Sequence, residues 1–215
     1  MAKRLGLVLV MLAGLAISCA TMTGAPSATP TVAGVLFQDD FSDPDSGWDR
    51  AQADGSLTDY VDGAYRIYVS EGNYDIWANP GRNFTDVSVE VEAAKAGGPD
   101  DNDLGVICRY QDIENFYYGV ISSDGFAGVL KVLDGEQSAI SGDSLEFADA
   151  IRKGDATNTI RFDCVGESLT LFVNGTEVAS ALDAEWSDGD VGLVAGTYDT
   201  PGTDIYFDNF IVREP

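Results

Sequence analysis

The sequence contains no histidine, and this absence excludes several kinds of site. Ser-His-Asp and Cys-His catalysis, histidine-ligated zinc and an imidazole general base all require that side chain. Basic residues are also scarce, because 12 Lys and Arg stand against 36 Asp and Glu, which gives a formal net charge of −24. Nucleic-acid binding needs clustered basic residues that neutralise phosphates, so we expect no nucleic-acid partner.

The apolar run near the N-terminus is too short to cross a membrane as a helix. It extends from Leu5 to Ile17 and follows the basic residues Lys3 and Arg4. A spanning helix needs roughly 20 apolar residues, whereas the apolar region of a signal peptide is shorter. Residues 1–18 are therefore expected to be an export signal.

The residues that close this run, Leu15-Ala16-Ile17-Ser18-Cys19, resemble the lipobox of bacterial lipoproteins. The resemblance implies cleavage before Cys19 and lipidation of that cysteine, although Ala16 occupies the place where leucine is preferred. Several acyl chains on one residue anchor a protein stably. We expect an exported cell-surface lipoprotein that contacts the bacterial membrane only through this anchor. The alternative is an ordinary secretory signal in which Cys19 is incidental.

The rest of the chain divides into a linker and one β domain. Residues 19–34 are mainly Ala, Thr, Ser, Pro and Gly, a composition typical of a flexible tether. From residue 35 to residue 215, short alternating runs are separated by turn residues; Asn174-Gly175, for example, favours a type I′ hairpin turn. About a dozen antiparallel strands are predicted, at 35–41, 64–69, 74–78, 84–94, 104–111, 115–121, 126–133, 158–165, 168–173, 176–181, 190–197 and 204–213. The fold class is therefore all-β, a single sandwich or jelly roll.

Residues 35–215 contain several short motifs that point to a known group of proteins. They are Phe37-Gln38-Asp39-Asp40-Phe41 with Gly47-Trp48, Gly105-Val106-Ile107-Cys108-Arg109-Tyr110, Asn115-Phe116-Tyr117, the stretch 169–175, Gly189-Asp190-Val191-Gly192-Leu193, and Phe207-Asp208-Asn209-Phe210. These motifs resemble the concanavalin A-like lectin/glucanase superfamily, in its laminin G-like and 3-keto-disaccharide hydrolase-like branches. The resemblance implies a concanavalin A-like jelly-roll sandwich, and it leaves the activity open because members include lectins, glucanases and adhesion domains.

Two cysteines remain if Cys19 is lipidated. Cys108 and Cys164 are then left to pair with each other, and an oxidising compartment favours a disulfide between them. Strand alternation places Cys108 on one face with Val106 and Tyr110, and the apolar neighbours indicate that both sulfurs point inward. The alternative is a pair of buried thiols that act as small hydrophobic groups.

Acidic residues suggest two further sites. The resemblance implies a structural Ca²⁺ between the first and last strands, where Asp40 and Asp208 lie, since Ca²⁺ prefers oxygen ligands. A solvated acidic surface is the alternative. Glu90 and Glu92 share one face of a strand at a spacing near that of glycosidase carboxylates. The chain lacks the acidic motif of the glucanase branch, so we expect no catalytic residue.

Aromatic residues are the candidates for ligand binding, because sugars commonly stack on aromatic faces. Trp77, Tyr110 and Tyr118 are predicted to contribute to such a face, together with Arg109, whose charge needs a carboxylate or ligand partner. For each aromatic side chain the alternative is a place in the core. Trp48 and Trp186 lie next to turns and are expected to pack over the core.

The leading functional hypothesis is a non-catalytic surface lipoprotein that binds glycan. A protein-binding adhesion or assembly module is the first alternative, and a flat apolar patch would favour it. A saccharide-acting hydrolase, similar to glycoside hydrolases, is the second alternative, and a cleft with paired carboxylates would favour it.

Overall fold

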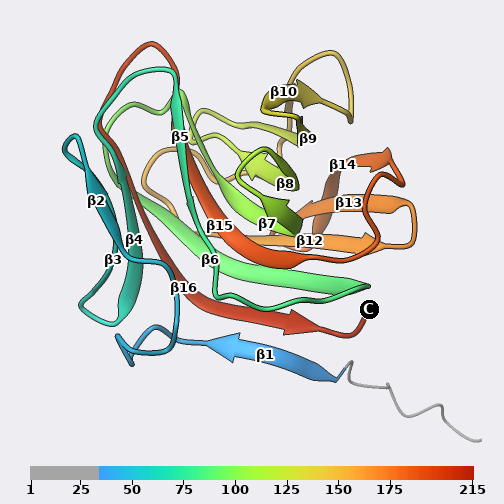
Figure 1. The fold of residues 1–215 in the computed structure, drawn as a ribbon. Coiled ribbons are helices and arrows are strands. Elements are labelled where there is room, and N and C mark those ends of the chain that lie inside the picture. The colour runs from blue at the N-terminus through green and yellow to red at the C-terminus, as the bar shows by residue number, and fades with distance from the viewer. Residues whose placement is uncertain (1–33) are drawn as a thin grey trace, which may run out of the picture. The chain divides into compact units, whose positions relative to one another are not determined.

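The computed structural model describes residues 34–215, and these residues contain two antiparallel sheets packed face to face (Figure 1). The predictions of a signal peptide, of lipidation at Cys19 and of a linker fall on residues outside this part, apart from Gly34. No helix long and apolar enough to cross a membrane occurs in the described residues. The prediction of an all-β sandwich is confirmed.

One sheet has nine strands. The strands in spatial order are β14 (Thr176–Leu182), β13 (Ser168–Val173), β12 (Asn158–Val165), β6 (Val87–Gly97), β16 (Thr203–Arg213), β4 (Ala64–Val69), β3 (Ser56–Val61) and β2 (Ala51–Ala53), and β1 (Val35–Asp39) also pairs with β16.

The other sheet has seven strands. Their order is β10 (Glu136–Ala139), β9 (Phe126–Leu133), β8 (Asn115–Ile121), β7 (Asn102–Asp112), β15 (Asp190–Thr197) and β5 (Tyr74–Ala78), and the short β11 (Glu146–Phe147) pairs with β9.

The two sheets differ in how their strands are buried. In β4 and β12 every second residue is buried and the residues between are partly exposed, so only one face of the nine-stranded sheet is covered. In β8 and β15 nearly every residue is buried. The seven-stranded sheet is therefore covered on both faces, by the partner sheet on one side and by its own side chains on the other.

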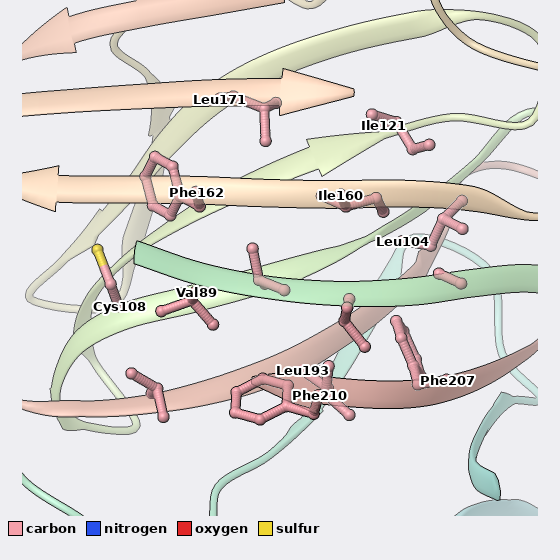
Figure 2. Close-up of a cluster of buried hydrophobic side chains, with 14 of the residues drawn as sticks. Val89, Leu104, Cys108, Ile121, Ile160, Phe162, Leu171, Leu193, Phe207 and Phe210 are labelled. Carbon is pink, nitrogen blue, oxygen red and sulfur yellow. The ribbon is translucent and has the colours of Figure 1, made fainter. Parts of the chain in front are cut away.

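Apolar side chains from both sheets fill the space between them. Figure 2 shows Val89 of β6, Phe162 of β12 and Leu104 of β7 within this layer, and all three are almost completely buried. At another part of the core Trp48 packs against Phe210, with ring centroids 4.8 Å apart. The prediction that Trp48 packs over the core is thus confirmed.

A disulfide joins Cys108 of β7 to Cys164 of β12 and links the two sheets. Both cysteines are fully buried within the layer between the sheets. The predicted disulfide is confirmed, and the alternative of two buried thiols is wrong.

The predicted alternation of β7 is wrong after Cys108. Arg109 adopts a left-handed conformation with φ of 53°, and the pairing of β7 shifts register between Cys108 and Asp112. Such a bulge inserts an extra residue and reverses the parity of the residues that follow. Tyr110 therefore packs on the outer face of the sheet, whereas Val106 and Cys108 face the core.

Removal of the disulfide should destabilise the sandwich strongly. The bond closes a loop across a sequence separation of 56 residues, which corresponds to about 4 kcal/mol of unfolded-state entropy. The double variant Cys108→Ala and Cys164→Ala is expected to lose about this much unfolding free energy in urea titrations. Detection of free Cys108 and Cys164 thiols in the unfolded, unreduced fragment 34–215 would contradict the assignment.

Candidate functional site

A cavity of about 390 Å³ opens on the outer face of the seven-stranded sheet, away from the nine-stranded sheet. Its wall comes from β5, β7, β8, β9, β10 and β15 and from the segment that follows β15. The chain thus brings residues from nearly the whole width of this sheet around one space.

The cavity exists because the seven-stranded sheet is strongly curved. β5 and β10 are five strands apart, so they would lie roughly 24 Å apart in a flat sheet. Gln137 of β10 nevertheless places its Nε2 3.4 Å from Oδ2 of Asp75 in β5. Gln137 also donates to the hydroxyl of Tyr118, which lies between these two strands. The two edges of the sheet therefore approach each other over its outer face.

Aromatic rings form one part of the cavity wall. The ring of Phe116 lies 5.2 Å from Trp77 and 5.5 Å from Tyr118, measured between centroids. Tyr74 stands at the rim, where 54% of its surface is exposed. Phe116 and Tyr118 are almost completely buried, so the partly exposed Trp77 and the exposed Tyr74 are the rings that can stack against a flat apolar face of a ligand.

Two carboxyl groups form the polar part of the cavity wall. Asp75 and Asp103 lie in one cross-strand row on either side of Gly196, which pairs with both. A Cβ at position 196 would collide with Oδ1 of Asp75 and stand 3.3 Å from Cβ of Asp103. Glycine at this position therefore leaves room for the two carboxyl groups to lie close together in the cavity.

Both carboxyl groups have raised pKa values. Burial raises the pKa of Asp75 to about 6. Burial, and next the charge of Asp75, raise the pKa of Asp103 to about 8. Tyr198 donates its hydroxyl hydrogen to Asp103, with distances of 3.0 and 3.1 Å to the two oxygens. Perturbed carboxyl groups inside a cavity are typical of functional sites.

Comparison with known proteins identifies the fold. No family model and no curated protein matches the sequence. Solved structures do match: the carbohydrate-binding module CBM66 from Bacillus subtilis superposes with a TM-score of 0.62 at 15% identity, over 78% of this chain and 96% of that one. The fold is a galectin-like jelly-roll sandwich.

Two further structures have the same architecture. A protein of unknown function with a galectin-like fold from Bacillus subtilis gives a TM-score of 0.61 at 10% identity, over 84% of this chain and 96% of that chain. A GlcNAcα1-4Gal-releasing endo-β-galactosidase from Clostridium perfringens gives 0.60 at 9% identity, over 89% of this chain and 65% of that chain. The galectin-like sandwich thus occurs in both a carbohydrate-binding module and a glycoside-cleaving enzyme.

The sandwich brings together two of the four residues predicted to bind ligand. Trp77 and Tyr118 line the cavity, and Tyr110 lies beside it, with its ring 5.5 Å from that of Phe116. Arg109 is elsewhere, because the bulge turns it away and leaves its side chain only 1% exposed.

Arg109 has protein partners at that position. Its guanidinium donates to the carbonyl of Trp186 at 2.9 Å and lies 3.4 Å from a carboxylate oxygen of Asp86. These contacts indicate a structural role in fixing the loop before β15.

The predicted calcium ligands lie where the first strand meets the last: Asp40 directly follows β1, and Asp208 belongs to β16, which pairs with β1. Asp40 accepts hydrogen bonds from Ser42, and Asp208 accepts one from the backbone of Asn209. Residues 34–215 contain no group of three or more His, Cys, Asp and Glu side chains suited to a metal ion.

Glu90 and Glu92 lie on the outer face of the other sheet, far from the cavity in the fold. Arg213 donates to Glu90 at 3.3 Å, and Asn209 donates to Glu92 at 3.0 Å. Both glutamates thus have structural partners within the nine-stranded sheet.

The sequence did not reveal the polar half of the cavity. Asp75, Asp103, Gln137 and Tyr198 are not among the residues predicted from the sequence. The available signal was the polar Asp75 in the otherwise apolar strand Tyr74–Ala78. Its partners lie in other strands, so only the tertiary structure brings them together.

The raised pKa of Asp103 predicts a pH-dependent stability. An unfolded aspartate ionises near pH 4, whereas folded Asp103 keeps its proton to about pH 8. The folded state thus binds the proton more tightly, so the contribution of Asp103 to stability decreases as the pH rises through this window. The groups that face it are Asp75, Tyr118, Tyr198, Asp101 and Asp124.

The measurement is the Tm of fragment 34–215 and of Asp103→Asn at several pH values from about 5 to about 8.5. The variant does not titrate at this position, so its Tm relative to the parent should increase with pH. Asp101→Asn, which removes the same charge from an exposed neighbour, is the control and should show a smaller trend. Parallel pH curves for the parent and Asp103→Asn would contradict the assignment.

Proposed function

We propose that this protein is a surface-anchored lipoprotein whose sandwich binds glycan in the cavity of the seven-stranded sheet. The proposal includes export, and anchoring to the bacterial membrane through Cys19. The observation that carries it is the cavity itself, in which the rings of Trp77, Phe116 and Tyr118 face the polar groups of Asp75 and Gln137.

This combination suits a sugar for two physical reasons. The C–H face of a pyranose is apolar and can lie on an aromatic ring, while its hydroxyl groups need hydrogen-bond partners at the edge. The volume of about 390 Å³ also falls within the range of small-molecule sites. The carbohydrate-binding module with this fold gives further support.

A glycan array probed with fragment 34–215 tests the proposal, because both sheets, their core and the disulfide lie within these residues. Tyr74→Ala should weaken the strongest signal roughly tenfold, since it removes an aromatic contact at the rim. Phe147→Ala is the matched control. The Phe147 side chain is 53% exposed, close to the 54% of Tyr74, and it lies outside the cavity.

If Tyr74→Ala and Phe147→Ala weaken binding equally, the ligand binds outside the cavity. Absence of binding across a broad array would favour a protein partner instead.

A hydrolase acting on saccharides is a second candidate, and one observation favours it. Glycosidases use two carboxyl groups about 5 to 9.5 Å apart, one of them with a raised pKa. Asp75 and Asp103 lie on either side of Gly196, and both have raised pKa values. Recovery of the bound oligosaccharide intact after prolonged incubation favours the binding module, and release of new reducing ends favours the enzyme.

A structural Ca²⁺ bound by Asp40 and Asp208 stays a prediction. If it binds, excess Ca²⁺ should raise the Tm of fragment 34–215 and EDTA should lower it. Equal Tm values in Ca²⁺ and in EDTA would contradict it.

A further inference from the structure

The carboxyl groups of the cavity lack a cationic partner, unlike those of Asp204 and Asp183. Asp204 binds Arg66 at 2.7 and 2.8 Å, and Asp183 binds Lys131 at 3.0 Å. Among the described residues, no Lys or Arg forms an ion pair with Asp75 or Asp103. A desolvated carboxylate without a counter-charge is costly, so this pair stands out energetically.

The two carboxyl groups also have few hydrogen-bond donors. An ionised carboxylate can accept about four hydrogen bonds. Asp103 receives the single hydroxyl hydrogen of Tyr198, and Asp75 receives a long contact of 3.4 Å from Gln137. Most of the accepting capacity of both groups therefore remains free toward the cavity.

The rest of the cavity suits a positive charge. Its lining contains no Lys or Arg, and the partly exposed ring of Trp77 presents negative π density. The chain as a whole carries a formal charge of −24, which attracts cations and repels acidic sugars. A ligand with a carboxylate or sulfate group would meet repulsion both at a distance and in the cavity.

We propose that the ligand of this cavity is a glycan with an unacetylated amino sugar, whose ammonium group binds the carboxyl groups of Asp75 and Asp103 beside Gly196. This inference rests on the proposed glycan-binding function and names the class of sugar. An ammonium group supplies three donors and one positive charge, which match the free acceptors and the missing counter-charge. A cation at this place lowers the pKa of both carboxyl groups, so Asp103, which keeps its proton to about pH 8 without ligand, is driven toward its ionised form when the ligand binds. The sugar ring then lies toward the aromatic wall.

Gly196 is essential to this arrangement. Oδ1 of Asp75 occupies the space over its Cα, and any side chain there would displace this carboxyl group from its place beside Asp103. An N-acetyl group in place of the ammonium would bring a methyl group and remove the charge. The cavity should therefore discriminate between the two forms of the same sugar.

Titration calorimetry with two matched probes tests the inference on fragment 34–215. The probes are a β-1,4-linked tetramer of glucosamine and the same tetramer fully N-acetylated, at about pH 6.5, where an amine with a pKa near 7.7 is mostly protonated. We expect the glucosamine tetramer to bind at least about tenfold more tightly, as is typical of a charge-assisted contact.

Variants separate the charge from the aromatic surface. Asp75→Asn should remove most of the preference for the amine, whereas Tyr74→Ala should weaken whichever probe binds without changing the preference. Asp62→Asn removes the same formal charge from an exposed residue outside the cavity lining and should leave the preference unchanged. Circular dichroism and Tm measurements serve to check that each variant is folded.

The outcomes distinguish the inference from the proposed function. Equal or tighter binding of the acetylated tetramer, or a preference that survives Asp75→Asn, overturns the amino-sugar assignment. A different result is that a neutral glycan on the array binds, that Tyr74→Ala weakens this binding, and that the glucosamine tetramer does not bind. This result overturns the inference and leaves the glycan-binding function standing. Absence of all glycan binding overturns both.

Discussion

The seven-stranded sheet has to bury side chains on both of its faces, and the rest of the structure follows from this constraint. One face packs Val106, Tyr117 and Leu193 against the nine-stranded sheet. The other face has no second sheet to cover it, so the sheet covers itself by curving until Gln137 at one edge reaches Asp75 near the other. The curvature creates the cavity, and the disulfide holds β7, at the centre of this sheet, to β12 of its partner.

The cavity owes its chemistry to where the alternation of the strands places polar residues. Apolar and aromatic residues cover the outer face at β8, and Asp75 and Asp103 interrupt it in one cross-strand row. Burial then keeps the pKa of both carboxyl groups above the ordinary range for aspartate. Charge, hydrogen-bonding capacity and an aromatic surface thus meet in a space of small-molecule size, which is what recognition of a sugar requires.

Sequence alone was sufficient for the β class, for most strands and for the disulfide. Alternating apolar residues located the long strands, and Asn174-Gly175 indeed has positive φ at both residues, as a type I′ turn requires. The four strands that were missed, β2, β3, β10 and β11, have only two to six residues each, and none contains a long run of alternating apolar residues. Their existence depends on the neighbouring strand rather than on their own residues.

The candidate site could be predicted only in part. Trp77 and Tyr118 were found because aromatic residues are visible in a sequence, but which face of β8 is core depends on the packing of the other sheet. The left-handed conformation of Arg109 reversed the parity of Tyr110, and nothing in the local sequence marks that residue as a bulge. Asp75 and Asp103 meet only because β15 lies between them with glycine at position 196.

The most direct measurement is a map of backbone amide shifts in ¹⁵N-labelled fragment 34–215 on addition of the glycan that binds most strongly. Our account predicts that the shifts concentrate on Asp75, Trp77, Asp103, Gln137 and Gly196. Shifts concentrated on the outer face of the nine-stranded sheet, around Glu90 and Arg213, would contradict it.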